Sequence, residues 1–306
     1  WTATIPLTAD AENEIKVVAV DDRDNEVQID TANKVVVRQR VDYSGVFPDS
    51  GSPLGSASSS LLLDKQRHRL IYQTNKTALH AIDIATAASQ ILVNFESQIA
   101  ASYGMGVVDK NNEYAYLPAL SDESIIKLDL QNPDNFNVFT NSVYAGYHGA
   151  MILDNSGEVP QLVSARNGDV EGTGGIVITR LDNWEATVFS DASLSIPDSS
   201  IPFNTTSSMA FDQKNNRYLV SGSSYDAVIA IDVTTGVRSI FSSESVGAGD
   251  DYGAGSDGKI RAIALDETHN RLIVLEIFTG NIFAVDLDTA ERSIISQMTL
   301  LHPTSD

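Results

Sequence analysis

The feature that most constrains the fold is an apolar run that ends in aspartate and recurs along the chain. A polar turn and a second apolar run follow each of these first aspartates, which are Asp64, Asp109, Asp154, Asp212 and Asp266. In most copies a third apolar run ends in a second aspartate, at Asp83, Asp129, Asp232 and Asp286. The copy that begins at Asp154 carries the insertion NGDVEGTGG before its counterpart, Asp182, and a fourth apolar run closes each unit.

The first aspartates recur at intervals of roughly 45 to 58 residues, close to the ~40–50-residue period of propeller blades. Short apolar runs separated by turns rich in Asn, Asp and Gly predict β-strands, four to a unit. A single four-stranded sheet cannot bury both of its faces, whereas radial stacking buries face against face and leaves no long edge unpaired. The repeat therefore predicts an all-β fold, a β-propeller of four-stranded blades, rather than a β-sandwich.

The first 45 residues allow two interpretations. Read with the repeat, Asp10 and Asp30 are the paired aspartates of a further blade, with NEIKVVAV and KVVVRQR as two of its strands. Read otherwise, WTATIPL and the following apolar run resemble the closing strands of a bacterial immunoglobulin-like module. Because a few orphan strands would not pack alone, six blades are favoured over five. Residues 1–306 are then a single propeller, and residues 46–306 belong to it under either interpretation.

Composition narrows the range of partners. The chain has 306 residues, 42% of them hydrophobic, so it can bury a sizeable core. Its 41 acidic residues outnumber its 20 Lys and Arg, and the net charge of −21 disfavours nucleic acid and anionic membrane surfaces as partners. No apolar run approaches the ~18 residues of a membrane-spanning helix, so no membrane insertion is expected. An acidic chain without cysteine suits an exported bacterial protein that is extracellular, at the cell surface or periplasmic.

Part of the repeat resembles known propeller families. The pattern LDxxxNRLxV, followed by IxAVDLxT and RxIIS, lies in Ile263–Ser296 and recurs in Met209–Ser243. It resembles NHL, strictosidine-synthase and gluconolactonase-type propellers, and above all the repeats of large exported proteins of marine bacteria, where such propellers follow immunoglobulin-like modules. The likeness spans roughly residues 55–300, but its motifs specify a blade and not a reaction. For the enzymes of these families it implies a calcium ion at the ring centre, without assigning ligands to numbered residues here.

Candidate catalytic residues lie a few positions ahead of the first aspartates, where the chain enters the strand that lines the ring axis. Most of these positions hold small side chains, but Tyr103, Tyr147, His148 and Arg261 stand out. An Arg that neutralises a uronate, beside a His or Tyr that moves a proton, would suit β-elimination on an acidic sugar. A propeller mouth is polar and wet in any case, so the same side chains also arise there without chemistry.

Candidate metal ligands lie in the insertion, where Asn167, Asp169 and Glu171 offer hard oxygen atoms of the kind that calcium prefers. Their spacing is not that of an EF-hand, and acidic surface loops are common in this chain. The segment Gly253–Lys259 matches most of a phosphate-binding loop, but the apolar strand IRAIALD follows it in place of a helix. That segment is therefore expected to be a turn-rich loop between blades.

The expected function is that of a non-catalytic module of an exported bacterial surface protein, which binds a glycan or a protein through one face of the ring. The alternative is a propeller enzyme acting at the channel mouth, either a calcium-dependent lactone hydrolase or a polysaccharide lyase. Framework-only resemblance and the lack of a complete catalytic signature favour the binding module.

Overall fold

The computed structural model falls into two units, Trp1–Ser52 and Pro53–Asp306, and each is described here by itself. In the second unit it describes residues 61–74, 78–86, 88–95, 106–119, 124–144, 147–167, 174–191, 206–222, 226–252 and 260–297. In the first unit it describes four short strands: β1 (Asn13–Glu14), β2 (Val18–Val20), β3 (Glu26–Gln28) and β4 (Val36–Val37).

The described strands of the first unit do not make a blade. β1 pairs with β4 and β2 pairs with β3, so they form two two-stranded sheets rather than one of four strands. The second unit contains five four-stranded sheets, and the described residues thus hold five blades. The favoured count of six is corrected to five, because the described strands β1 to β4 pair only in twos and form no four-stranded sheet.

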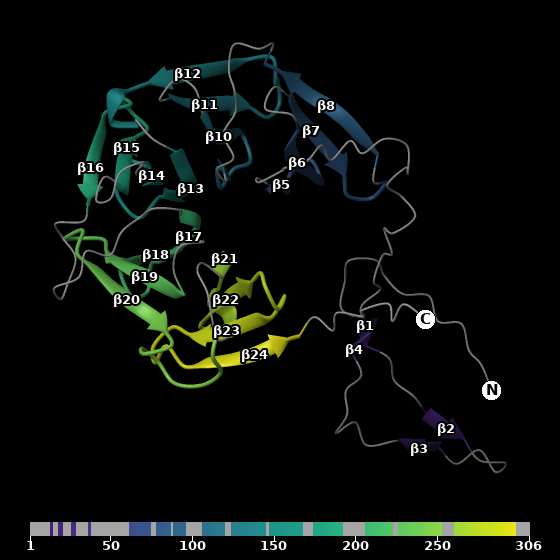
Figure 1. Ribbon diagram of the computed structural model, residues 1–306. Helices are drawn as coiled ribbons and strands as arrows, with labels where there is room; N and C mark the ends of the chain where they lie inside the picture. Colours follow the sequence, from purple (N-terminus) through teal and green to yellow (C-terminus); the bar gives the residue numbers. More distant parts are fainter. Residues whose placement is uncertain are drawn as a thin grey trace, which may run out of the picture. The chain divides into compact units, whose positions relative to one another are not determined.

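The five blades of the second unit follow one another along the chain (Figure 1). Blade one contains β5 (Leu61–Asp64), β6 (Arg69–Thr74), β7 (Ala78–Asp83) and β8 (Ser89–Asn94). Blade two contains β9 (Val107–Val108), β10 (Tyr114–Ala119), β11 (Ser124–Asp129) and β12 (Phe136–Thr140). Blade three contains β13 (Tyr147–Asp154), β14 (Gln161–Asn167), β15 (Gly175–Arg180) and β16 (Ala186–Ser190).

Blade four contains β17 (Thr206–Asp212), β18 (Arg217–Gly222), β19 (Ala227–Asp232) and β20 (Arg238–Ser243). Blade five contains β21 (Ile260–Asp266), β22 (Arg271–Glu276), β23 (Ile282–Asp286) and β24 (Arg292–Ser296). Two short 3₁₀ helices, η1 (Ser142–Tyr144) and η3 (Glu267–His269), lie in connections. Within the described residues, no helix is long and apolar enough to span a membrane.

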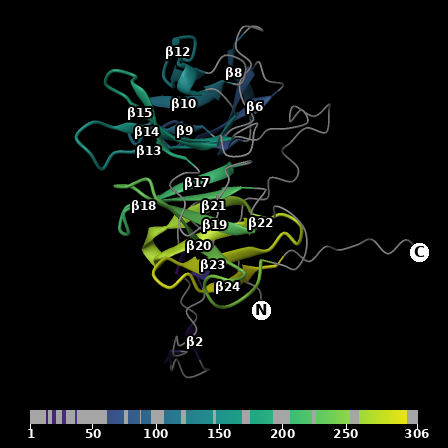
Figure 2. The same cartoon turned by 60° about the vertical axis from the view of Figure 1, so that its left-hand side comes forward.

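Each blade is an antiparallel meander in which every strand pairs with the next one in sequence (Figure 2). The first aspartate of blade one, Asp64, lies opposite Arg69 at the start of the second strand, and Asp212 lies opposite Arg217 in the same way. The first strands β13, β17 and β21 contact one another in succession, which places them toward the ring axis. The expected all-β propeller of four-stranded blades is confirmed.

The turns after the first aspartates explain the Asn-rich pattern between the strands. Asn216 and Asn270 adopt a left-handed backbone conformation, with φ of 52° each, directly before the second strand of their blades. Among residues other than glycine, asparagine tolerates this conformation best, because its short polar side chain can bond to nearby backbone groups. In these turns the carboxylates of Asp212 and Asp266 accept hydrogen bonds from the backbone N–H groups of Asn215 and His269, respectively.

Apolar side chains fill the spaces between neighbouring blades. The described residues form four buried clusters, one at each interface from blades one and two to blades four and five. Ile71 of blade one and Leu219 of blade four are at most 1% exposed, because the following blade covers them. No buried cluster among the described residues joins blade five to blade one. The counterpart in blade five, Ile273, is accordingly only half-buried.

An ion pair that recurs in three blades is also less buried in blade five than in blades one and four. Arg69 pairs with Asp64 and Arg217 with Asp212, and each arginine also donates to a main-chain carbonyl of the next blade, that of Leu130 or Leu287. The exposed fractions of Arg and Asp are 12% and 0% in blade one and 18% and 2% in blade four. In blade five the pair of Arg271 and Asp266 is 33% and 24% exposed, and no described residue covers it as the next blade does elsewhere.

We therefore expect the same substitution to have unequal effects in blades four and five. Arg217→Ala removes a buried ion pair and a cross-blade hydrogen bond, and should lower the free energy of unfolding by about 2–3 kcal/mol. Arg271→Ala removes an ion pair of identical length that is partly in water, and should cost less than about 1 kcal/mol. Urea unfolding of the two variants measures this difference, and equal losses would show that blade five is covered as well as blade four.

Candidate binding face

The sequence-predicted catalytic residues are only partly within the described structure. Tyr103 lies outside the described residues. Tyr147 and His148 are the first residues of β13, where their backbones pair with Asn167 and Arg166 of β14. Arg261 is an exposed residue of β21, in blade five. The structure thus places two of the four on one strand and a third two blades further on, and the catalytic role of this set stays a prediction.

A bulge recurs where these residues enter the first strand. The pairing register of the first two strands shifts between His148 and Ala150, and likewise around Ser207 and Arg261 in blades four and five. A bulge re-aims one side chain and is frequent next to binding sites. Because the bulge recurs in three successive blades, Arg261 lies at a repeated backbone irregularity. The spacing of the aspartates in the sequence did not reveal this irregularity.

The predicted calcium loop is almost entirely outside the described residues. Asn167 ends β14, and Asp169 and Glu171 follow beyond it. Among the described residues, no group of three or more His, Asp or Glu side chains is arranged to hold a metal ion. Calcium at Asn167, Asp169 and Glu171 therefore stays a prediction.

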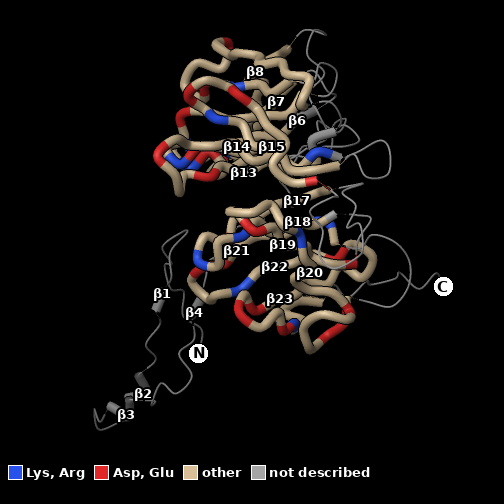
Figure 3. The backbone as a smooth tube through the Cα atoms, turned by 90° about the vertical axis from the view of Figure 1, so that its left-hand side faces the viewer, with Lys and Arg blue, Asp and Glu red and all other residues tan. Residues whose placement is uncertain are grey.

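The aspartate turns lie on one side of the ring, here called the aspartate-turn face. It consists of the turns that follow the first and third strands of each blade. Because these two strands of an antiparallel meander run in the same direction, their C-terminal ends lie at the same edge of the blade. Figure 3 shows acidic residues at many of these turns.

The first aspartates are structural. Asp64, Asp154 and Asp212 are buried, and two of them accept hydrogen bonds from arginines of their own blade. Asp154 instead accepts a bond of 2.6 Å from the hydroxyl of Tyr218 in blade four. Burial, together with this carboxylate, raises the pKa of Tyr218 far above its usual range. These carboxylates fasten the fold and are not available to a ligand.

The second aspartates cap the turns between the third and fourth strands. Asp232 accepts hydrogen bonds from the hydroxyl and the backbone N–H of Thr235, and Asp286 accepts the same pair from Thr289. The Thr235 hydroxyl bond is the main cause that lowers the pKa of Asp232. Hydrogen bonds to the charged form favour ionisation, so these half-buried carboxylates are negative at neutral pH.

A lowered pKa in the folded state has a defined consequence for acid stability. Asp232 contributes stability that is present above its unfolded pKa of 3.8 and is lost as the pH falls through the lower folded value. Thr235→Ala should therefore be less stable than wild type at neutral pH, and the difference should shrink as the pH falls below 3.8. Urea unfolding across pH measures this, with exposed Thr187→Ala as a control whose effect should not depend on pH.

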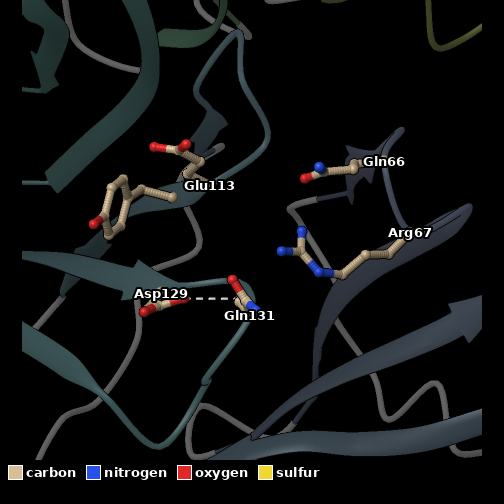
Figure 4. A pocket seen from close by; sticks show the side chains of 6 residues that line it. Gln66, Arg67, Glu113, Asp129 and Gln131 are labelled. Carbon is tan, nitrogen blue, oxygen red and sulfur yellow. Dashed lines mark hydrogen bonds between the residues drawn. The ribbon is translucent and has the colours of Figure 1, made fainter.

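A cleft opens on this face between blades one and two, with a volume of about 570 Å³ (Figure 4). The side chains that line it are Gln66, Arg67, Glu113, Tyr114, Asp129 and Gln131. Arg67 donates through Nη1 to Asp64 and to the main-chain oxygen of Asn112, 2.8 Å away, so it belongs partly to the interface between the blades. The side chains of Gln66, Glu113 and Gln131 make no hydrogen bond to any other described residue.

A second cleft lies at the equivalent place between blades four and five, with a volume of about 360 Å³. Lys214 extends from blade four into this space. Its Nζ donates to Asn270 Oδ1 at 2.9 Å and to both carboxylate oxygens of Asp288 at 3.1 Å. The protein thus places a cation of its own against the far wall of the second cleft. Within the described residues, the bonds across the first cleft run from Lys65 N–H and Arg67 Nη1 to Asn112, and none involves the side chains of Gln66, Glu113 or Gln131.

The residues of the first cleft were not singled out from the sequence. Glutamine and glutamate at turn positions are common on protein surfaces and carry no motif of their own. A comparison of equivalent positions between blades could have pointed to them, because Gln66 stands where blade four has Lys214.

Comparisons with known proteins support the fold. No family model matches the chain, and no curated protein matches it. The structure is similar to a chain in the crystal structure of the nidogen/laminin complex, with 9% identity, a TM-score of 0.56 and 78% of each chain covered. It is also similar to a structural genomics protein of unknown function from Bacteroides thetaiotaomicron, with 12% identity and a TM-score of 0.59, over 79% of this chain and 58% of that one. At these identities the likeness shows a β-propeller fold and no more.

Proposed function

We propose that the protein is a non-catalytic binding module that engages a protein partner through its aspartate-turn face, at the cleft between blades one and two. The observation that carries this proposal is the contrast between the two clefts. Lys214 bonds to the far wall of the cleft between blades four and five, while the side chains of Gln66, Glu113 and Gln131 have no hydrogen-bond partner among the described residues. Unpaired polar groups at the rim of a cleft can bond to a ligand without first breaking internal bonds.

A protein partner fits this surface better than a polyanion does. The net charge of −21 repels phosphate backbones and acidic polysaccharides alike. One structural neighbour was solved within a complex between two proteins, which adds a fold-level analogy. The setting that we propose, an exported bacterial surface protein, rests on the acidic, cysteine-free sequence.

The absence of cysteine from the chain permits a clean blocking experiment. In Gln66→Cys the new thiol would carry a maleimide-linked polyethylene glycol that covers the cleft. The control is Thr187→Cys, an exposed position on the outer strand of blade three, with the same polymer. Both proteins, with and without polymer, would be applied to a displayed peptide library and to a glycan array.

We expect enriched peptides whose binding falls at least tenfold with polymer on Gln66→Cys and less than twofold with polymer on Thr187→Cys. Peptides that bind equally well to both conjugates would overturn the assignment of the face. Binding to the glycan array alone, blocked at the same position, would replace the protein partner by a carbohydrate.

A further inference from the structure

The rotational repeat of the propeller lets the residues of the two clefts be matched one by one. Gln66 and Lys214 each stand two residues after the first aspartate of their blade, and Gln131 and Asp288 each stand two residues after the second aspartate of the next blade. The third pair is fixed by a backbone bond. The carbonyl of Glu113 accepts from Leu130 N–H at 2.8 Å, as that of Asn270 accepts from Leu287 N–H at 3.1 Å.

The matched positions hold the same chemistry on the far wall of each cleft. In the cleft between blades four and five, one amide and one carboxylate, those of Asn270 and Asp288, bind the Lys214 ammonium. In the open cleft, one carboxylate and one amide, those of Glu113 and Gln131, occupy the same two places with their order exchanged. The open cleft has Gln66 at the position of Lys214, and its one lining cation, Arg67, is bonded to Asp64 and to the main-chain oxygen of Asn112. Lys214 therefore serves as an internal model for the missing occupant.

The other two interfaces between blades do not have this pair of groups. In blade three, Arg180 holds the position of the second aspartate, because it pairs with Gln161 at the start of the second strand. Between blades two and three, the matched positions on the far wall are therefore Pro160 and Asp182, and Pro160 has no side-chain polar group. Between blades three and four they are Asn216 and Thr234, which bond to each other at 3.0 Å. Only the first and last of the four interfaces thus carry an amide beside a carboxylate.

The charges around the open cleft are arranged across it (Figure 4). Arg67 lies on the blade-one wall, where it is held by the buried carboxylate of Asp64, which also binds Arg69. Glu113 and Asp129 lie on the blade-two wall, and backbone N–H bonds from Gln131 and Asn132 leave Asp129 ionised. A cation entering from solvent would meet this acidic wall, and the acidic protein would attract it from a distance.

We propose that the cleft between blades one and two binds the ammonium group of a lysine side chain from the partner protein, held by Glu113 and Gln131 as Asn270 and Asp288 hold Lys214. This inference rests on the function proposed above and names the chemistry that the partner presents. The bond would be charge-assisted and would weaken with salt, since the cleft is open to solvent.

The test uses a blocked lysine, Nα-acetyl-lysine N-methylamide, as the probe, and its neutral Nε-acetyl analogue as the matched control ligand. Binding to the full chain would be followed by NMR titration. We expect the charged probe to bind at one site per chain, with weak affinity, and the neutral probe to bind at least tenfold more weakly. Equal binding of the two probes would show that the cleft does not select a cation.

Variants that swap the residues at the two matched positions locate the binding site of the probe. Gln66→Lys installs the internal occupant and should abolish binding, whereas Lys214→Gln opens the second cleft and should raise the number of bound probes from one to two. Glu113→Gln should weaken binding at least fivefold. Glu291→Gln removes the same charge from another exposed turn of this face and should change binding less than twofold. An equal effect of Glu113→Gln and Glu291→Gln would reduce the attraction to general electrostatics and overturn the site.

The two proposals can fail separately. Peptides that the polymer on Gln66→Cys blocks, but that bind Glu113→Gln as well as wild type, would keep the binding face and refute the lysine. A lysine probe that binds in the cleft, with no macromolecule blocked there, would keep the cation site and refute the protein-binding function.

Discussion

Arg238→Met is expected to lower the free energy of unfolding by about 3–5 kcal/mol, because Arg238 is fully buried and bonds blade four to blade three. Its Nε donates to Ser190 Oγ at 3.0 Å, and Nη2 donates to the carbonyls of Ser190 and Gly174 at 3.0 and 3.3 Å. Methionine fills much of the volume but donates no hydrogen bond, so these buried oxygens would lose their donors.

The control for this variant is Arg180→Met, the same change at an exposed arginine that pairs with Asp182. Exposed ion pairs contribute about 0–1 kcal/mol, so the control should remain close to wild type. Urea unfolding followed by fluorescence gives both free energies. If Arg238→Met lies within about 1 kcal/mol of Arg180→Met, the hydrogen bonds of Arg238 do not hold the two blades together.

The second large effect is expected for Gly149→Ala, in the bulge of β13. A Cβ atom at this position would overlap the backbone carbonyl of Thr206, in the first strand of the next blade. Neither partner can yield easily, since both are backbone atoms where β13 and β17 contact each other. We expect a loss of at least about 3 kcal/mol, or a drop in melting temperature of roughly 8 °C, measured by thermal unfolding.

Gly157→Ala provides the matched control for the inner-strand glycine. Gly157 lies in the exposed turn between β13 and β14, where an added Cβ would meet only the Val159 carbonyl at 3.7 Å. That is an ordinary contact, and the variant should lie within about 0.5 kcal/mol of wild type. Similar losses for the two variants would mean that the first strands of blades three and four do not approach as closely as the structure has them.

The contrast between these two glycines illustrates what a single sequence can and cannot reveal. Neither glycine lies in a distinguishing motif. The repeat predicts only that Gly149 lies at the entrance of a strand and that Gly157 lies in a turn. The close approach of Gly149 to Thr206 joins residues more than fifty positions apart, and depends on how the first strands meet at the ring axis. Only the packing of blades makes one glycine indispensable.

The candidate site shows the same division. Tyr103, Tyr147, His148 and Arg261 drew attention because their side chains are chemically versatile, while Gln66, Glu113 and Gln131 look like ordinary surface residues. The cleft that the latter form exists because two turns from different blades come together, and its far wall has no bond to a lysine because blade one has Gln66 where blade four has Lys214. Residue type alone could not show which of the two walls is already bonded.

The sequence by itself determined the strands, the turns and the propeller of residues 61–297. Alternating apolar residues and turns with aspartate are local properties, and every copy of the repeat carries them. The sequence also placed the second aspartates at the ends of the third strands in blades one, two, four and five, whereas in blade three Arg180 ends that strand and Asp182 lies in the turn that follows. The tertiary structure alone decided that there are five described blades, that Asp64 and Asp212 are buried while Asp266 is partly exposed, and that Lys214 bonds across its cleft. The physical reason is that burial and pairing depend on the neighbouring blade, and equivalent positions in a repeat differ only through the neighbour that each one meets.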